Sequence, residues 1–324
     1  MINISNFTKN LLDDINKFQK IALFVHVTPD CDAIGSAYAM YHFLKLNFPK
    51  KQVKIAGMSK LNTSYLPEFF QVKYASVDEE FVNDSLGIVF DTANQDRIYA
   101  KQFFKCSKTY RIDHHIQVEK ICDEELIDKD ASSTCELLGL VIKQSNLNLN
   151  SDIVNSLYFG LLTDTIRFIT SNVNANTYAV MTFIEKSGFL QRKLVHDQLY
   201  LKSIHDLKLE KKLFKYIKFK KDYAYMFFNK RLTDKYGMNN LKSKLFLMSG
   251  LKEVKIYFMV YYDSVTNIFK GSLRSRDYNV NLVAKKFNGG GHMYASGFKL
   301  NDKSELKLLK KEISKLLTKK DKYE

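Results

Sequence analysis

The strongest constraint on the fold is the alternation of short apolar runs with helical stretches in the first half of the chain. Short runs rich in β-branched and aromatic residues are typical of strands buried on both faces. Within 34–48 the apolar residues recur at the three- and four-residue spacing of one buried helix face. Strands that alternate with helices favour a parallel sheet with helices on both faces, which makes the fold class α/β. The runs predict strands at 21–25, 53–56, 86–90 and 109–112, and helices at 34–48, 132–144 and 152–162.

The pattern changes after about residue 192, where a second and smaller α/β domain is expected. Its predicted elements are a Lys-rich amphipathic helix at 207–221, strands at 223–228, 254–262 and 268–273, a helix at 280–287, a glycine-rich loop, and a last helix at 303–319. We therefore expect a first domain at 1–190, a helical linker at 191–205 and a second domain at 206–324.

The charge of the chain is basic, but its meaning is not specific. The 324 residues include 50 Lys and Arg against 35 Asp and Glu, a formal net charge of +15, and only seven of the basic residues are Arg. A basic excess attracts phosphate-rich partners. A lysine-rich solvated surface gives the same count, so charge alone leaves both interpretations open.

Composition also limits where the chain can act. Hydrophobic residues make up 45% of it, which is ordinary for a globular protein of about two domains. No apolar run approaches the ~20 residues of a membrane span, and the first residues lack the order of a signal peptide. The four cysteines form no CxxC pair, so neither a disulfide framework nor a zinc knuckle is favoured. We therefore expect a cytoplasmic protein without a membrane partner.

Acidic and imidazole side chains follow the predicted strands at the points where the strands end. The carboxyl ends of parallel strands meet at one edge of a sheet, so we expect these side chains to converge. Carboxylates clustered there repel one another and are costly to bury, and a divalent cation removes both costs. The candidates are His26, Asp30 and Asp32 after 21–25, Asp91 after 86–90, Asp113, His114 and His115 after 109–112, and Asp164 after 152–162.

The donor types indicate which ions such a site would take. Imidazole and carboxylate without thiolate suit Mn²⁺ better than a structural zinc site, with Mg²⁺ or Co²⁺ as alternatives. The donors exceed what one ion needs, so we expect two ions that share a carboxylate and act on a phosphoryl group. An Asp after a strand is also a common turn or helix-cap residue, which leaves that interpretation open for Asp91 or Asp32 taken alone.

Six segments, in order along about 270 residues, resemble the motifs of the DHH phosphoesterases. The match is nearest to the subfamily of nanoRNases and 3′-phosphoadenosine 5′-phosphate phosphatases, and the last two segments resemble its DHHA1 substrate domain. The segments are His26-Val-Thr-Pro-Asp30-Cys-Asp32, Asp91-Thr-Ala-Asn94 with Arg97, Asp113-His114-His115, Gly160-Leu-Leu-Thr-Asp164, Gly271-Ser-Leu-Arg274 and Gly289-Gly290-Gly291-His292.

The resemblance implies a role for each matched residue. His26 and Asp30 would bind a first metal ion, a second would be held by Asp32, His114 and Asp164, and Asp91 would bridge the two. His115 would contact phosphate just outside the metals and Asp113 would orient an imidazole, which makes Asp91, Asp113 and His115 the catalytic set. Substrate would be held by Arg274, Gly289, Gly290, Gly291 and His292, with the active site in a cleft between the two domains.

The resemblance also implies an activity. The chain would degrade very short RNA to 5′-mononucleotides in the 3′–5′ direction, and would dephosphorylate 3′-phosphoadenosine 5′-phosphate to AMP, with Mn²⁺ as the expected metal. Short RNA and adenosine nucleotides would be its partners, and a homodimer is compatible with the family. Two alternatives stay open: a phosphodiesterase for cyclic di-AMP or pApA, and a nucleotide-binding protein without turnover.

One departure from the family pattern concerns the fourth motif. The family usually has Gly after Thr-Asp-Thr, where this chain has Ile166. A branched side chain there would narrow the site or shift the local backbone. Ser296 in place of the usual Ala is a milder change.

Overall fold

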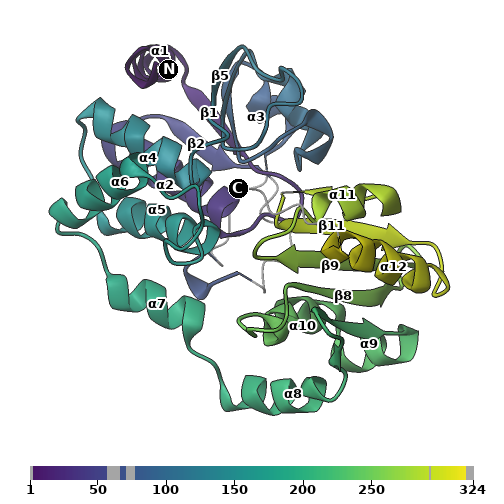
Figure 1. Cartoon of the computed structure of the whole chain (residues 1–324). Helices are drawn as coiled ribbons and strands as arrows, with labels where there is room; N and C mark the ends of the chain where they lie inside the picture. The colour runs from purple at the N-terminus through teal and green to yellow at the C-terminus, as the bar shows by residue number, and fades with distance from the viewer. Residues whose placement is uncertain (1–2, 57–65, 71–76, 292, 319–324) are drawn as a thin grey trace. The chain divides into compact units, whose positions relative to one another are not determined.

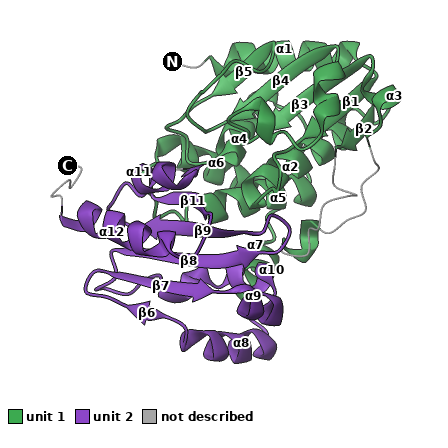
Figure 2. Cartoon of the chain, turned by 90° about the vertical axis from the view of Figure 1, so that its right-hand side faces the viewer, with its two compact units in different colours: residues 1–201 green, residues 202–324 purple. Residues whose placement is uncertain are grey.

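The computed structural model describes residues 3–56, 66–70, 77–291 and 293–318 (Figure 1). The chain divides into two compact units, Met1–Leu201 and Lys202–Glu324 (Figure 2). This division falls inside the segment 191–205 that the sequence analysis assigns to a linker. Within the described ranges, no helix is both long and apolar enough to cross a membrane.

The first unit is built on a parallel sheet with the strand order β2-β1-β3-β4-β5. All four predicted strands are confirmed, and β5 is an additional one, in which Leu126 is the only fully buried side chain. A strand with one buried residue leaves no apolar run for sequence analysis to detect. The strands are β1 (Lys20–Phe24), β2 (Gln52–Ile55), β3 (Ser85–Phe90), β4 (Lys108–Asp113) and β5 (Glu124–Ile127).

Helices cover both faces of this sheet, as predicted. Alternate residues of β1 separate the two layers: Ile21 and Leu23 belong to the core with the longer helices, whereas Ala22 and Phe24 pack on the opposite side with α3 and η4. The helices are α1 (Ile4–Lys17), α2 (Cys31–Asn47), α3 (Glu79–Val82), α4 (Thr134–Ser145), α5 (Ser151–Asp164), α6 (Ala175–Lys186) and α7 (Arg192–Tyr200), with 3-10 turns η2 (Glu68–Phe70), η3 (Gln95–Arg97) and η4 (Lys101–Lys105).

Helix α2 differs from the expected amphipathic helix. Every residue from Asp32 to Met40 is buried, not only those on one face. The reason is that α2 packs on strands β1, β2 and β3 and also contacts α4 and α5. A helix covered on several sides is apolar all round, so its periodicity understates its burial.

The second unit is a mixed sheet with the order β10-β11-β9-β8-β7-β6, in which only β7 and β8 run parallel. Helices α11 and α12 pack on one face, and α8, α10 and η5 pack on the other. The strands are β6 (Lys218–Phe219), β7 (Tyr223–Phe228), β8 (Ile256–Asp263), β9 (Ile268–Ser275), β10 (Gly290–Gly291) and β11 (Ala295–Leu300). The helices are α8 (Ile204–Phe214), α9 (Lys230–Tyr236), α10 (Met238–Ser243), η5 (Leu245–Met248), α11 (Asn281–Ala284), η6 (Lys285–Phe287) and α12 (Glu305–Thr318).

Two expectations for this unit were wrong in detail. The helix predicted at 207–221 ends at Phe214, and Lys218 and Phe219 form the edge strand β6. Most side chains at an edge strand are solvated, so its Lys-rich sequence looks like the polar face of a helix. The expected glycine loop is partly a strand, because Gly290 and Gly291 pair with β11.

Candidate functional site

His26 and Asp30 are placed by the loop between β1 and α2. The His26 Nδ1 lies 2.8 Å from the carbonyl oxygen of Val27, which makes Nδ1 the donor and Nε2 the candidate ligand atom. Nε2 lies 3.4 Å from the Asp91 Oδ2. Asp30 is the N-cap of α2, and its Oδ1 accepts the backbone N–H groups of Asp32 and Ala33 at 3.1 Å each.

Asp32 is fully buried and is held by a different helix from its own. Its two carboxylate oxygens accept the backbone N–H groups of Thr134 and Cys135, at 2.7 and 2.9 Å, in the first turn of α4. The interpretation of Asp32 as the cap of the helix that follows it is therefore wrong, because Asp30 has that role. The positive end of α4 stabilises a buried negative charge at Asp32.

Asp91 lies at the centre of the site. It follows β3 with a φ of +54°, a left-handed conformation that Asp tolerates better than most residues. Its carboxylate oxygens are 3.4 Å from the His26 Nε2, 3.5 Å from the His114 Nε2 and 3.3 Å from the His115 Nδ1. Asp91 is thus a turn residue and also the contact point of three imidazoles.

His114 brings β4 and α5 together at the same place. Its Nε2 lies 3.3 Å from the Oδ2 of Asp164, the last residue of α5, and 3.9 Å from the Asp32 Oδ2. The contacts α5 makes with α2 set the position of Asp164.

The residues form groups whose donor atoms lie within 4.8 Å of one another. One group is His26, Asp30 and Asp91, and another is Asp32, His114 and Asp164. These are the two sets that the resemblance implied for two metal ions. A third group, Asp91, His114 and His115, shares members with both and connects them.

The electrostatics of the cluster favour cations. Burial raises the pKa of Asp32 to about 7, and the Asp91 carboxylate adds to the rise. Burial also raises the pKa of Asp164 well above its usual range, with a further contribution from Asp32. For Asp91 burial acts in the same direction, but hydrogen bonds from His115 and His26 outweigh it and hold the pKa well below its usual value. Divalent cations would neutralise this cluster in place of protons, so the donor set fits them.

His115 contacts Asp113, which forms a buried ion pair with Arg111. Its Nδ1 lies 2.7 Å from the Asp113 Oδ1, the kind of contact predicted for Asp113. Burial lowers the pKa of His115, but the hydrogen bonds and negative charges of Asp113 and Asp91 together outweigh it and raise the pKa to about 10. The Oδ2 of Asp113 accepts hydrogen bonds from Nε and Nη2 of Arg111, which is 0% exposed. Sequence analysis missed Arg111, although a charged residue inside an apolar strand was the available clue.

The substrate-binding candidates lie in the second unit. Arg274 is on β9 and pairs in register with Ala295 of β11, and the next strand is the glycine pair of β10. Its Nη1 donates to the carbonyl oxygen of Leu273, and burial lowers its pKa. His292 lies outside the described residues.

The three glycines at 289–291 differ in whether the fold requires glycine at their position. A Cβ at Gly289 would lie 2.0 Å from the carbonyl oxygen of Gly297, and Gly291 has a φ of +135°. A Cβ at Gly290 would meet nothing within 4 Å. The fold therefore explains the glycines at 289 and 291, whereas the open space at Gly290 is compatible with close approach of a ligand.

Two alanine substitutions test this difference. We expect Gly289→Ala to lower the free energy of unfolding by about 2 kcal/mol or more, because the new methyl overlaps backbone atoms. Gly290→Ala should leave stability within about 0.5 kcal/mol and raise KM for a ligand that approaches this backbone. Urea unfolding and steady-state kinetics on both variants measure this. Equal stability losses, or an unchanged KM for Gly290→Ala, would contradict the assignment.

The departure at Ile166 has a backbone cost. Ile166, Arg167 and Phe168 have φ values of +48°, +63° and +64°. A β-branched residue is strained in this left-handed region, which Gly adopts freely. Ile166 is 58% exposed, so the hydrophobic burial of its side chain offsets little of the backbone strain.

Glycine at position 166 should therefore increase the stability of the fold. We expect Ile166→Gly to raise the free energy of unfolding by up to about 1 kcal/mol, because relief of about 1–2 kcal/mol of strain exceeds the entropy cost of Gly. Ile169 is 73% exposed and is not among the positive-φ residues, so Ile169→Gly should lower stability by about 0.5–1 kcal/mol. Opposite signs in urea unfolding support the strain; a loss in both variants refutes it.

Comparison with known proteins agrees with the fold. The model of the DHH family N-terminal domain matches residues 20–161, and the model of the DHHA1 domain matches residues 223–319. The uncharacterized protein MG371 of Mycoplasma genitalium is 37% identical over 94% of each chain. The bifunctional oligoribonuclease and PAP phosphatase NrnA of Bacillus subtilis is 30% identical over 89% of this chain and 91% of its own. An exopolyphosphatase-related protein from Bacteroides fragilis has the same fold, with a TM-score of 0.83 and 23% identity over 96% of each chain.

Acids and imidazoles at the carboxyl edge of a parallel sheet, together with these matches, define the class as hydrolases of phosphate esters. The chain belongs to the DHH phosphoesterase family and carries a DHHA1 domain in its second unit. The predicted family resemblance is confirmed.

Proposed function

We propose that this protein hydrolyses very short RNA to 5′-mononucleotides and removes the 3′-phosphate from 3′-phosphoadenosine 5′-phosphate. The observation that carries the proposal is Asp91, which belongs to one donor group with His26 and Asp30 and to another with His114 and His115. A carboxylate shared in this way suits a pair of divalent cations. The similarity to NrnA of Bacillus subtilis over most of both chains supports the substrate class.

In this proposal, the metal-binding and substrate-binding residues have different roles. Two divalent cations, with Mn²⁺ favoured by the mixed donors, would supply a strong nucleophile and neutralise charge on the phosphate. His115, whose Nδ1 is held by the Asp113 Oδ1 at 2.7 Å, would contact a phosphate oxygen. Arg274 and the backbone at Gly290 would bind the substrate's phosphate or base.

A substrate panel tests the proposal. Purified full-length protein is mixed with Mn²⁺, Mg²⁺ or Co²⁺ and with labelled RNAs from two nucleotides to about two dozen. The panel also contains 3′-phosphoadenosine 5′-phosphate, pApA and cyclic di-AMP. We expect metal-dependent release of 5′-mononucleotides, fastest from dimers and trimers, and release of AMP from the bisphosphate. Absence of turnover on every short substrate would overturn the proposal, and turnover of cyclic di-AMP or pApA alone would assign the alternative activity.

A further inference from the structure

The basic excess of the chain belongs entirely to the second unit. Residues 202–324 contain 29 Lys and Arg against 12 Asp and Glu, whereas residues 1–201 contain 21 against 23. A general preference for lysine on solvated surfaces would affect both units alike. The difference points to a partner of the second unit that carries negative charge.

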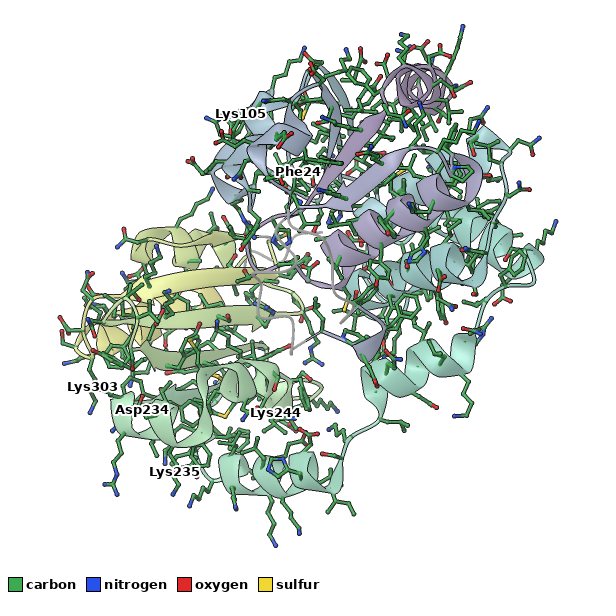
Figure 3. All side chains as sticks on the ribbon, turned by 180° about the vertical axis from the view of Figure 1, so that it is seen from behind. Phe24, Lys105, Asp234, Lys235, Lys244 and Lys303 are labelled. Carbon is green, nitrogen blue, oxygen red and sulfur yellow. The ribbon has the colours of Figure 1, made fainter. Side chains whose placement is uncertain are left out.

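Much of this excess gathers on one short stretch, which we call the α8–β6 face. It consists of α8, β6 and the residues that follow each of them, and its lysines are Lys208, Lys211, Lys212, Lys215, Lys218, Lys220 and Lys221. All seven are exposed. Among the ion pairs of the described residues, none involves any of the seven. Figure 3 shows side chains with nitrogen tips that project outward from α8.

The acids within or beside this stretch pair with other lysines. The Asp206 Oδ1 lies 2.9 Å from the Lys244 Nζ, and the Asp222 Oδ1 lies 3.2 Å from the Lys255 Nζ. Glu210 is 8% exposed and its carboxylate faces inward. Lys202 and Lys244, at 3.1 and 3.3 Å, already bind its two oxygens. Lys244 is labelled in Figure 3 and is itself buried. None of these three acids therefore forms an ion pair with the seven lysines of the α8–β6 face.

Two exposed phenylalanines lie among these lysines. Phe214 is 55% exposed and Phe219 is 50% exposed, with ring centroids 6.5 Å apart. Lysines alone are a common protection of an edge strand against pairing with another chain. Exposed aromatic rings beside them have the opposite effect, so edge protection does not explain the face. Cations that follow a phosphate backbone, with rings on which bases stack, are the usual pattern of single-strand binding.

The α8–β6 face is also distinct from the substrate-binding candidates. β6 is at one edge of the six-stranded sheet and the glycine strand β10 is at the other. At about 4.8 Å per strand, the two edges are about 24 Å apart. A dinucleotide held at β10 would not reach the lysines of β6.

We propose that the α8–β6 face binds single-stranded RNA longer than the substrates of the metal site, and holds it without cleaving it. The exposed lysines contact the phosphates, and Phe214 and Phe219 stack with bases. The ligand is defined by the two kinds of contact together: a polyanion whose bases are unpaired.

Binding without turnover tests this directly. The full-length protein is titrated in EDTA against a fluorescent single-stranded RNA of about 24 nucleotides. The quadruple variant Lys211→Gln, Lys212→Gln, Lys215→Gln and Lys218→Gln should weaken binding at least about tenfold and reduce the slope of log Kd against log salt by about 3. Phe214→Ala with Phe219→Ala should weaken binding about fivefold or more and lessen the preference for single-stranded over double-stranded RNA.

A second quadruple variant removes the same charge elsewhere in the unit. Lys252, Lys299, Lys307 and Lys311 are exposed and outside the α8–β6 face. Their change to Gln should weaken RNA binding less than about threefold. Equal effects of the two quadruple variants on RNA binding would overturn the proposal. Absence of RNA binding would also overturn it, as would binding of phosphatidylglycerol vesicles instead of RNA. Hydrolysis of dinucleotides should be unchanged in the α8–β6 variants, so failure here and failure of the proposed activity are separate results.

Discussion

Asp91→Asn should abolish turnover, with a loss of at least about a thousandfold in kcat/KM, equivalent to about 4 kcal/mol. The Asp91 carboxylate lies within 3.5 Å of a ring nitrogen of each of His26, His114 and His115. An amide has nearly the same shape but lacks the charge that cations or imidazoles need. Because Asn also adopts positive φ readily, the backbone at +54° is preserved.

The chain offers a matched control for this variant. Asp84 precedes β3 and has a φ of +58°, so it is an Asp of the same backbone conformation at the other end of the same strand. It is exposed and lies outside the donor groups. Asp84→Asn should retain activity within about twofold, as surface changes usually do. Dinucleotide hydrolysis by both variants, with circular dichroism to verify folding, decides the matter. Substantial turnover by Asp91→Asn would refute the shared-carboxylate site, whereas a wild type without turnover would indicate a binding protein.

Arg111→Met should strongly lower the free energy of unfolding. Arg111 and Asp113 are both 0% exposed, and the guanidinium also donates to the carbonyl oxygens of Ala93 and Glu119. Arg111→Met removes the group that binds the buried Oδ2 of Asp113 and leaves only His115 at the other oxygen. Loss of one member of a buried ion pair costs about 3–5 kcal/mol. Asp113 would then hold His115 less firmly, so turnover should fall as well.

An exposed ion pair in the same unit provides the comparison. The Lys105 Nζ lies 2.6 Å from the Glu79 Oε2, and both side chains are at least half exposed. Lys105 is labelled in Figure 3. Lys105→Met should change stability by less than about 1 kcal/mol. Urea unfolding, with the transitions of the two units fitted separately, measures both variants. A loss below about 1 kcal/mol for Arg111→Met would mean that the charge of Asp113 is neutralised by other groups.

The site was predictable to the extent that it depends on strand ends. His26, Asp91 and His114 each follow a recognisable strand, and parallel strands bring their carboxyl ends to one edge whatever the rest of the fold does. Asp164 was proposed as the acid at the end of a predicted helix and again through its motif, since no strand rule places it.

Other features depend on contacts that sequence patterns do not contain. The N–H groups that hold Asp32 belong to Thr134 and Cys135, about a hundred residues further along the chain. The edge strand β6 has too few buried side chains to be told from a helix. The role of Arg111 follows from where Asp113 points and from which carbonyl oxygens are near.

The sequence by itself determined the α/β class, the presence of acids and imidazoles at the carboxyl ends of parallel strands, and the family. It did so because strand burial and chain direction are written in short local patterns. Only the tertiary structure decided which backbone groups hold Asp32, which glycine the fold requires, and that the acids near Lys211 pair with other lysines. Those outcomes depend on distances between side chains far apart in the chain, and packing alone sets such distances.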